Sequence, residues 1–262
     1  MCIRMCVLGS GSKGNCTYVG CNNTNILIDM GLPIRRIEKS LAVIGVNPAS
    51  VSILSTHEHS DHVKTVDAYV KKYGVPVYAN EASKDGLGQF CDFDAGNYIF
   101  FEEESFFVGE LTVTPFKVSH DVPCVGYSIE GYGKKLSVAT DIGKVTPSVL
   151  KSVIGSDLVV LESNHDCAML EKNAVYPRYL KNRILSGKGH LSNEDCAITI
   201  RTLVATGTKQ AVLAHLSEEN NCPELAFETV KRVVEDGGYI EGKDIRIEVA
   251  EQNRLSSMFE IS

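Results

Sequence analysis

Four side chains that commonly bind metal ions lie within six consecutive residues near the end of the first quarter of this chain. They are His57, His59, Asp61 and His62, in the run HEHSDH. The chain has only 7 histidines in 262 residues, so three of them this close together are not expected of an ordinary polar surface loop. Imidazole and carboxylate groups suit zinc, manganese, iron or nickel, and these residues offer enough ligands for two ions rather than one.

The sequence before this run predicts a strand that delivers the ligands. Residues 51–56 are mostly apolar and β-branched. In an extended chain, residues two apart point to the same side, so His57, His59 and Asp61 are expected to share a face. His62 breaks this alternation and can turn toward a second position. We therefore predict a metal-binding loop at the end of a strand.

Three more potential ligands each follow an apolar segment that is expected to be a strand. His120 follows residues 111–118, Asp141 follows residues 136–140, and His215 follows residues 211–214. Strand ends hold side chains in precise positions, as a metal site requires. Each residue alone would more often be a capping or core residue, but together with the loop they complete a set of seven ligands.

The elements that must position these ligands form an alternating pattern of strands and helices. Further strands are expected at residues 25–29, 75–79, 98–101, 106–108, 124–130, 135–140, 158–162 and 245–249. Helices are expected near residues 63–73, from Thr146 and Ser192 as N-caps, and at residues 223–236. We predict one layered α/β domain over residues 1–262, with two sheets packed face to face and helices outside.

Composition places the chain in a broad class. Hydrophobic residues make up 44% of the chain, enough for a sizeable core, and no apolar run reaches the ~18 residues of a membrane span. The apolar start is too short for a signal peptide. The 9 cysteines form no Cys-x-x-Cys pair, which favours reduced thiols and a cytoplasmic location.

The chain is acidic as a whole but contains one basic stretch. The net charge is −7, which disfavours loose attraction to nucleic acid over the whole surface. Residues 172–190, however, contain no Asp or Glu. Their five cations are Lys172, Arg178, Lys181, Arg183 and Lys188. This basic stretch is either a solvated helical face or the approach for an anionic substrate.

The order of the ligand residues resembles that of the metallo-β-lactamase-fold hydrolases, and the resemblance spans nearly the whole chain. It implies a four-layer αββα sandwich with two divalent metal ions at one edge of the sheets, zinc or manganese, with iron or nickel as alternatives. By this resemblance His57, His59 and His120 would hold one ion. The other would be held by Asp61, His62 and His215, with Asp141 between the two.

Asp29 matches the early acidic position of the same family. It would either support a metal-ligating residue through a hydrogen bond or form a turn before Gly31.

A narrower likeness is to the YycJ/WalJ branch, which consists of bacterial proteins regarded as DNA 5′-to-3′ exonucleases. Residues 9–15, 28–31, 162–166 and 189–193 carry it. The glycine-rich opening is not a nucleotide-binding P-loop, because Asn15 and Cys16 follow Gly14 where Lys and Ser or Thr would be needed. A turn near the site that offers backbone N–H groups to a phosphate fits better.

The expected activity is metal-dependent phosphodiester hydrolysis, most simply by a DNA exonuclease. Two close ions can hold a hydroxide, lower the pKa of its parent water and stabilise an oxyanion. The catalytic candidates are Asp61 and His190. His190 would act as a proton donor, or it is only a polar residue before a helix. The candidates for contacting substrate are Asn15, His165, Arg178 and Lys181, with structural support of the site as the alternative role for His165. The expected partner is nucleic acid, DNA by the family likeness, with no membrane and no obligate protein partner.

Three alternatives compete with this interpretation. A thioester or lactone hydrolase of the same fold would use the same ions, but the basic stretch argues against it. A diiron oxidoreductase of this fold would have Glu where His59 stands and an attached flavin domain, and this chain has neither. A metal-loaded binding module without turnover is disfavoured by the intact ligand set and the candidate proton donor.

Overall fold

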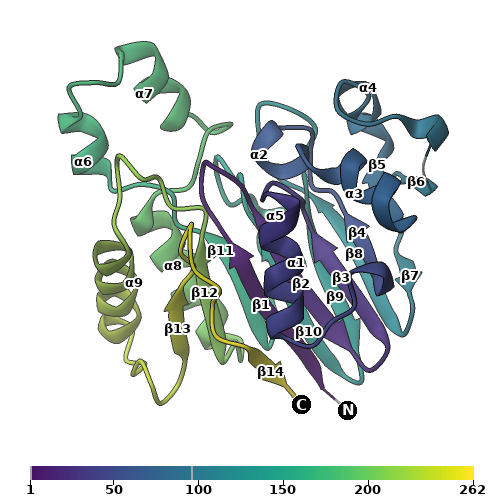
Figure 1. The fold of residues 1–262 in the computed structure, drawn as a ribbon. Coiled ribbons are helices and arrows are strands. Elements are labelled where there is room, and N and C mark those ends of the chain that lie inside the picture. The colour runs from purple at the N-terminus through teal and green to yellow at the C-terminus, as the bar shows by residue number, and fades with distance from the viewer. Residues whose placement is uncertain (1, 96) are drawn as a thin grey trace.

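The computed structural model describes residues 2–95 and 97–262, and these fold into two sheets packed face to face with helices on both outer sides (Figure 1). Within the described residues each sheet has seven strands. The first sheet has, in spatial order, β14 (Phe259–Ile261), β1 (Ile3–Gly9), β2 (Cys16–Cys21), β3 (Thr24–Ile28), β4 (Val51–Leu54), β5 (Pro76–Asn80) and β6 (Asn97–Phe101). Strands β3 to β6 pair in parallel, and the other pairs are antiparallel.

The second sheet has the same mixed character. Its spatial order is β13 (Arg246–Val249), β12 (Gln210–Ala214), β11 (Leu158–Glu162), β10 (Lys134–Ala139), β9 (Val125–Gly131), β8 (Leu111–Lys117) and β7 (Phe106–Val108). Strands β10 to β13 are parallel neighbours. Every residue of β11 is buried, as expected of a parallel strand that is covered on both faces.

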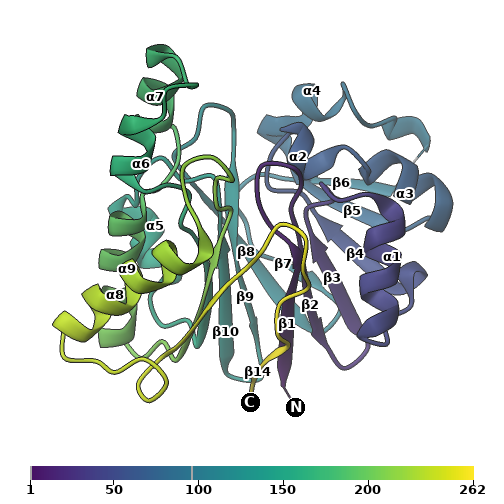
Figure 2. The same ribbon diagram turned by 60° about the vertical axis from the view of Figure 1, so that its left-hand side comes forward.

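The helices cover the outer faces of the sandwich (Figure 2). On the side of the first sheet lie α1 (Ile34–Val43), α2 (Ser60–Val63), α3 (Val66–Tyr73) and α4 (Lys84–Leu87). On the side of the second sheet lie α5 (Pro147–Val153), α6 (Cys167–Lys172), α7 (Arg178–Ile184), α8 (Asn193–Ala205) and α9 (Pro223–Asp236). Short 3₁₀ helices occur at Pro48–Ser50, Glu81–Ser83 and Phe93–Ala95.

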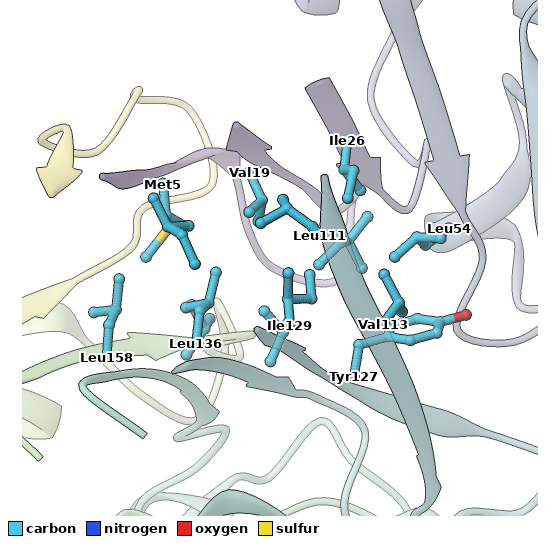
Figure 3. Close-up of a cluster of buried hydrophobic side chains, with 14 of the residues drawn as sticks. Met5, Val19, Ile26, Leu54, Leu111, Val113, Tyr127, Ile129, Leu136 and Leu158 are labelled. Carbon is cyan, nitrogen blue, oxygen red and sulfur yellow. The ribbon is translucent and has the colours of Figure 1, made fainter. Parts of the chain in front are cut away.

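Three buried apolar clusters hold the layers together. The middle cluster lies between the sheets, where Met5 and Ile26 of the first sheet face Ile129 and Leu136 of the second (Figure 3). A second cluster joins the first sheet to α1 and α3, and a third joins the second sheet to α5, α8 and α9. The αββα sandwich predicted from the sequence is therefore the observed fold.

Most of the predicted elements are present within a few residues of their expected bounds. Thr146 caps α5 by accepting a hydrogen bond from the backbone N–H of Val149, with Pro147 at the first helical position. The helix predicted near residues 63–73 is α3, which begins at Val66 and is preceded by the short helix α2. Strands β1, β2 and β14 were not predicted. None of the helices in the described part of the chain is both long and apolar enough to span a membrane.

Candidate metal centre

All seven predicted ligands lie together at one edge of the sandwich. They lie in the segments that follow β4, β8, β10 and β12, and ligands typically bind at the carboxyl ends of parallel strands. The potential ligand atoms form overlapping groups in which all atoms lie within 4.8 Å of one another. Three of these groups consist of predicted ligands alone, namely His57/His59/His120, Asp61/His62/His215 and His57/His62/Asp141.

The first group is built on the end of β4 and the end of β8. Nε2 of His57 lies 3.0 Å from Nδ1 of His59, which lies 3.3 Å from Nε2 of His120. The expectation that Asp61 shares this face is wrong. The chain leaves the extended conformation directly after His59, the N-cap of α2, so Asp61 lies in the first turn of that helix and turns into the second group.

Asp141 lies between the two groups. In the second group, Oδ2 of Asp61 lies 3.3 Å from Nε2 of His62 and 3.5 Å from Nε2 of His215. Oδ2 of Asp141 lies 3.2 Å from Nε2 of His62, and its Oδ1 lies 3.9 Å from Nε2 of His120. One carboxylate thus faces a histidine of each group.

The backbone at three of the strand ends adopts an uncommon conformation. Asp29, Asp141 and His215 have φ values of 63°, 56° and 58°, in the left-handed region that side chains other than glycine seldom occupy. Such strain persists where the surrounding structure enforces it, and it often marks functional sites. Here it turns the chain sharply after β3, β10 and β12.

Two of the histidines, His62 and His215, contact buried carboxylates through the ring nitrogen Nδ1. Nδ1 of His62 lies 2.7 Å from Oδ2 of Asp29, whose carboxylate also accepts hydrogen bonds from the N–H and hydroxyl of Thr56. Nδ1 of His215 lies 2.7 Å from Oε1 of Glu162. Partners of this kind fix the orientation of a metal-ligating imidazole. Asp29 therefore has the contacts expected of a supporting residue.

Glu162 is a site residue that the sequence analysis did not identify. Its Oε1 also lies 2.8 Å from Nδ1 of His190, and its Oε2 accepts hydrogen bonds from the backbone N–H groups of Ile142 and Leu191. The side chain is fully buried. A carboxylate at the end of an otherwise apolar strand was the signal that could have revealed it.

Mutual contacts keep the buried acids ionised. Burial raises the pKa of Glu162, but the charges of His190 and His215 and their hydrogen bonds outweigh it and lower the pKa to about 2. Burial likewise raises the pKa of Asp61, but the close approach and charge of His215 and His62 bring it well below its usual value. For His62, burial lowers the pKa, while the nearby Asp141 and Asp29 raise it further than burial lowers it.

Unpaired polar atoms at the centre of these groups fit a metal ion. Oδ2 of Asp141 and Nε2 of His215 are buried and make no hydrogen bond to any described residue. Buried polar atoms are rarely left in that state, and the surrounding donors are imidazole nitrogens and carboxylate oxygens. The donor set therefore suits a divalent metal ion.

The four predicted substrate contacts lie in different surroundings. Asn15 is buried beside the ligands, where its amide donates to Oδ2 of Asp61 and its Oδ1 accepts from the N–H of Gly11. His165 is only 1% exposed, and neither of its ring nitrogens has a hydrogen-bond partner among the described residues. Arg178 and Lys181 lie on α7, outside the ligand groups. Contact of these four residues with substrate stays a prediction.

Replacing Asp29 by Asn should weaken metal binding or activity about 10- to 100-fold, the usual cost of removing a supporting partner of a ligand. The amide cannot supply the second acceptor oxygen that now faces His62 and Thr56. Metal titration against a competing chelator measures the change. Asp236→Asn, at the exposed end of α9, is the control. Equal metal affinity in both variants would contradict a supporting role for Asp29.

Comparison with known proteins identifies relatives over the whole chain. Residues 24–216 match the family model described as a beta-lactamase superfamily domain. The exodeoxyribonuclease YycJ of Bacillus anthracis is 37% identical over 255 residues, covering 94% of this chain and 95% of that protein. The exodeoxyribonuclease WalJ of Streptococcus pneumoniae is 35% identical over 249 residues, covering 92% of this chain and 91% of that protein.

A solved structure supports the fold independently. The metallo-beta-lactamase fold protein YhfI from Bacillus subtilis aligns with a TM-score of 0.74 at 15% identity, over 99% of this chain and 100% of that one. At this identity the likeness concerns the fold alone.

Proposed function

Since this chain belongs to the beta-lactamase superfamily and is a metal-dependent hydrolase, we propose that it is a DNA 5′-to-3′ exonuclease built on one domain. The strongest support is the convergence of its predicted ligands beside His190, at the end of the molecule that also carries the basic stretch. Relatives at 35% to 37% identity that cover more than nine-tenths of the chain bear the name exodeoxyribonuclease.

The proposed cofactor is a pair of divalent ions, zinc or manganese. His57, His59 and His120 would hold one ion, and Asp61, His62 and His215 the other, with Asp141 shared by both. When bound, such ions supply Lewis-acid stabilisation of the negative charge that builds up on a phosphate oxygen.

His190 is proposed to donate a proton to the leaving oxygen of the phosphodiester. Its Nδ1 faces Glu162 at 2.8 Å, which leaves Nε2 available to a substrate atom. Its ring lies beside the rings of His120 and His215, with centroids 5.6 Å and 5.3 Å apart. Burial lowers the pKa of His190, but the adjacent Glu162 charge and hydrogen bond raise it overall, which favours the protonated form that an acid needs.

Residues 167–188, which contain α6 and α7 and are named the basic arm here, are proposed to guide the phosphate backbone. Figures 1 and 2 place the arm at the same end of the sandwich as α2, away from both termini. Nε of Arg183 donates to Oδ2 of Asp121 at 3.1 Å, and Oδ1 of Asp121 lies 3.2 Å from Nε2 of His120. The arm thus reaches the ligand groups. Cations such as Arg178 would bind phosphates without reading sequence.

A nuclease assay tests the proposal. Purified protein is incubated with end-labelled single- and double-stranded DNA and RNA, with manganese, zinc or magnesium in parallel. We expect DNA to be shortened from its 5′ end with a divalent metal and to stay intact with excess chelator. Activity on thioesters or lactones with none on phosphodiesters would contradict the proposal and favour the alternative hydrolase.

A further inference from the structure

The basic arm has little support from the core of the protein, because Leu170 of α6 is its one buried residue. None of residues 171–188 is buried, and α7 contributes no buried side chain. A helix of only 7 residues is marginal in water when it has no packing partner. The arm is therefore a segment whose outer face is available to another molecule.

Three large apolar side chains of the arm are exposed to solvent. Val175 is 82% exposed, Tyr179 is 76% exposed and Leu185 is 54% exposed. Three such groups within one short exposed segment favour a binding surface. A cavity of about 650 Å³ lies against the same segment, lined in part by Tyr176 and Arg178.

The charge of the arm indicates what kind of molecule covers this face. Its apolar and aromatic groups alternate with the five cations of residues 172–188, and no acid lies between them. Within the described residues, the guanidinium of Arg178 has no ion-pair partner, so its charge is free for a ligand. A polyanion that also presents flat apolar rings is complementary to both features, and unpaired nucleic acid is such a molecule.

We infer that the basic arm binds unpaired nucleotides of the DNA strand, with a base stacked on the ring of Tyr179 and phosphates on the neighbouring cations. This rests on the proposed function and narrows its substrate to DNA with unpaired nucleotides at the bound end. Stacking on an aromatic ring tolerates every base, which suits an enzyme that moves along a strand of any sequence.

Contacts at one end of the arm fix it beside the ligand groups. Arg183 is paired with Asp121, and the hydroxyl of Ser119 donates to the backbone carbonyl of Gly187. Gly143 packs so closely on this segment that a Cβ there would lie 2.4 Å from the carbonyl of Gly187. The end of the arm next to His190 is therefore fixed, whereas the face with Tyr179 is free.

Binding of a phosphorothioate oligonucleotide that resists cleavage tests the inference on the metal-loaded protein. One base is 2-aminopurine, whose fluorescence is quenched by stacking. We expect Tyr179→Ala to bind about 5- to 150-fold more weakly, the range for losing one stacked base, and to lose the quenching. Tyr179→Phe keeps the ring and should bind within about twofold of the wild type. Phe107→Ala, which removes a 74% exposed ring from β7, is the matched control.

An oligonucleotide of abasic sites separates stacking from phosphate contacts. It should bind to the wild type and to Tyr179→Ala equally. Unchanged binding of the normal strand by Tyr179→Ala, or an equal loss on both strands, would overturn the inference. It would also be overturned by a dimer in sedimentation that Tyr179→Ala dissociates, because a second copy would then cover this face.

Cleavage of an unmodified strand by the same preparations distinguishes this inference from the proposed function. Quenching by wild-type protein that cleaves no DNA would support the arm as a binding surface and reject the nuclease. Cleavage by wild-type protein, with normal binding and quenching in Tyr179→Ala, would reject stacking alone.

Discussion

Replacing Asp141 by Ala should remove the metal-dependent hydrolytic activity, with a loss well beyond the about 10- to 100-fold typical of a supporting residue. The carboxylate is 2% exposed, and its oxygens face His62 of one ligand group and His120 of the other. Removing this carboxylate leaves both ligand groups without the acidic side chain that lies between them. Activity on a phosphodiester and metal content by elemental analysis, after reconstitution with excess metal, measure the effect.

Two further variants make the Asp141 experiment specific. Asp141→Asn keeps the volume of the side chain and removes its charge, and it should also bind less metal than the wild type. Asp236→Ala, which removes an exposed carboxylate at the end of α9, should retain both metal and activity. Full metal content together with full activity in Asp141→Ala would rule out a shared ligand at this position.

Replacing His190 by Ala should lower kcat for DNA cleavage by about 10²- to 10⁴-fold, the usual contribution of general acid catalysis. The loss should depend on the leaving group. A p-nitrophenyl ester of a nucleotide releases an anion that needs no proton, so its hydrolysis should fall far less. Comparing kcat for the two substrates at saturation measures the difference, with unchanged metal content as the expected companion result.

The His190 variant also distinguishes a proton donor from a ligand. His190 belongs to a fourth group of potential ligands, with Asp141, Glu162 and His215. A fall in metal content, with an equal loss on both substrates, would make His190 a ligand. Unchanged cleavage of DNA at saturation would exclude both roles.

The sequence by itself determined the fold class and the seven candidate ligands. Both rest on local features, because apolar β-branched segments form strands, and residues such as Asp141 and His215 directly follow them. The run from His57 to His62 needed no knowledge of distant contacts to be recognised as unusual. Its division between two ligand groups was implied by the family resemblance and not by the local pattern. The structure supplies the physical reason, because α2 begins at Ser60 and turns Asp61 away from His57.

Asp29 was predicted as a supporting residue, but only the tertiary structure revealed the supporting role of Glu162 and decided which surfaces stay uncovered. Glu162 meets His190 and His215, which follow it by 28 and 53 positions, and β14 pairs with β1 from the other end of the chain. Such contacts depend on how the layers pack, and no local pattern encodes them. The exposure of Tyr179 has the same origin, because a helix with apolar residues is buried or free according to what the rest of the fold places beside it.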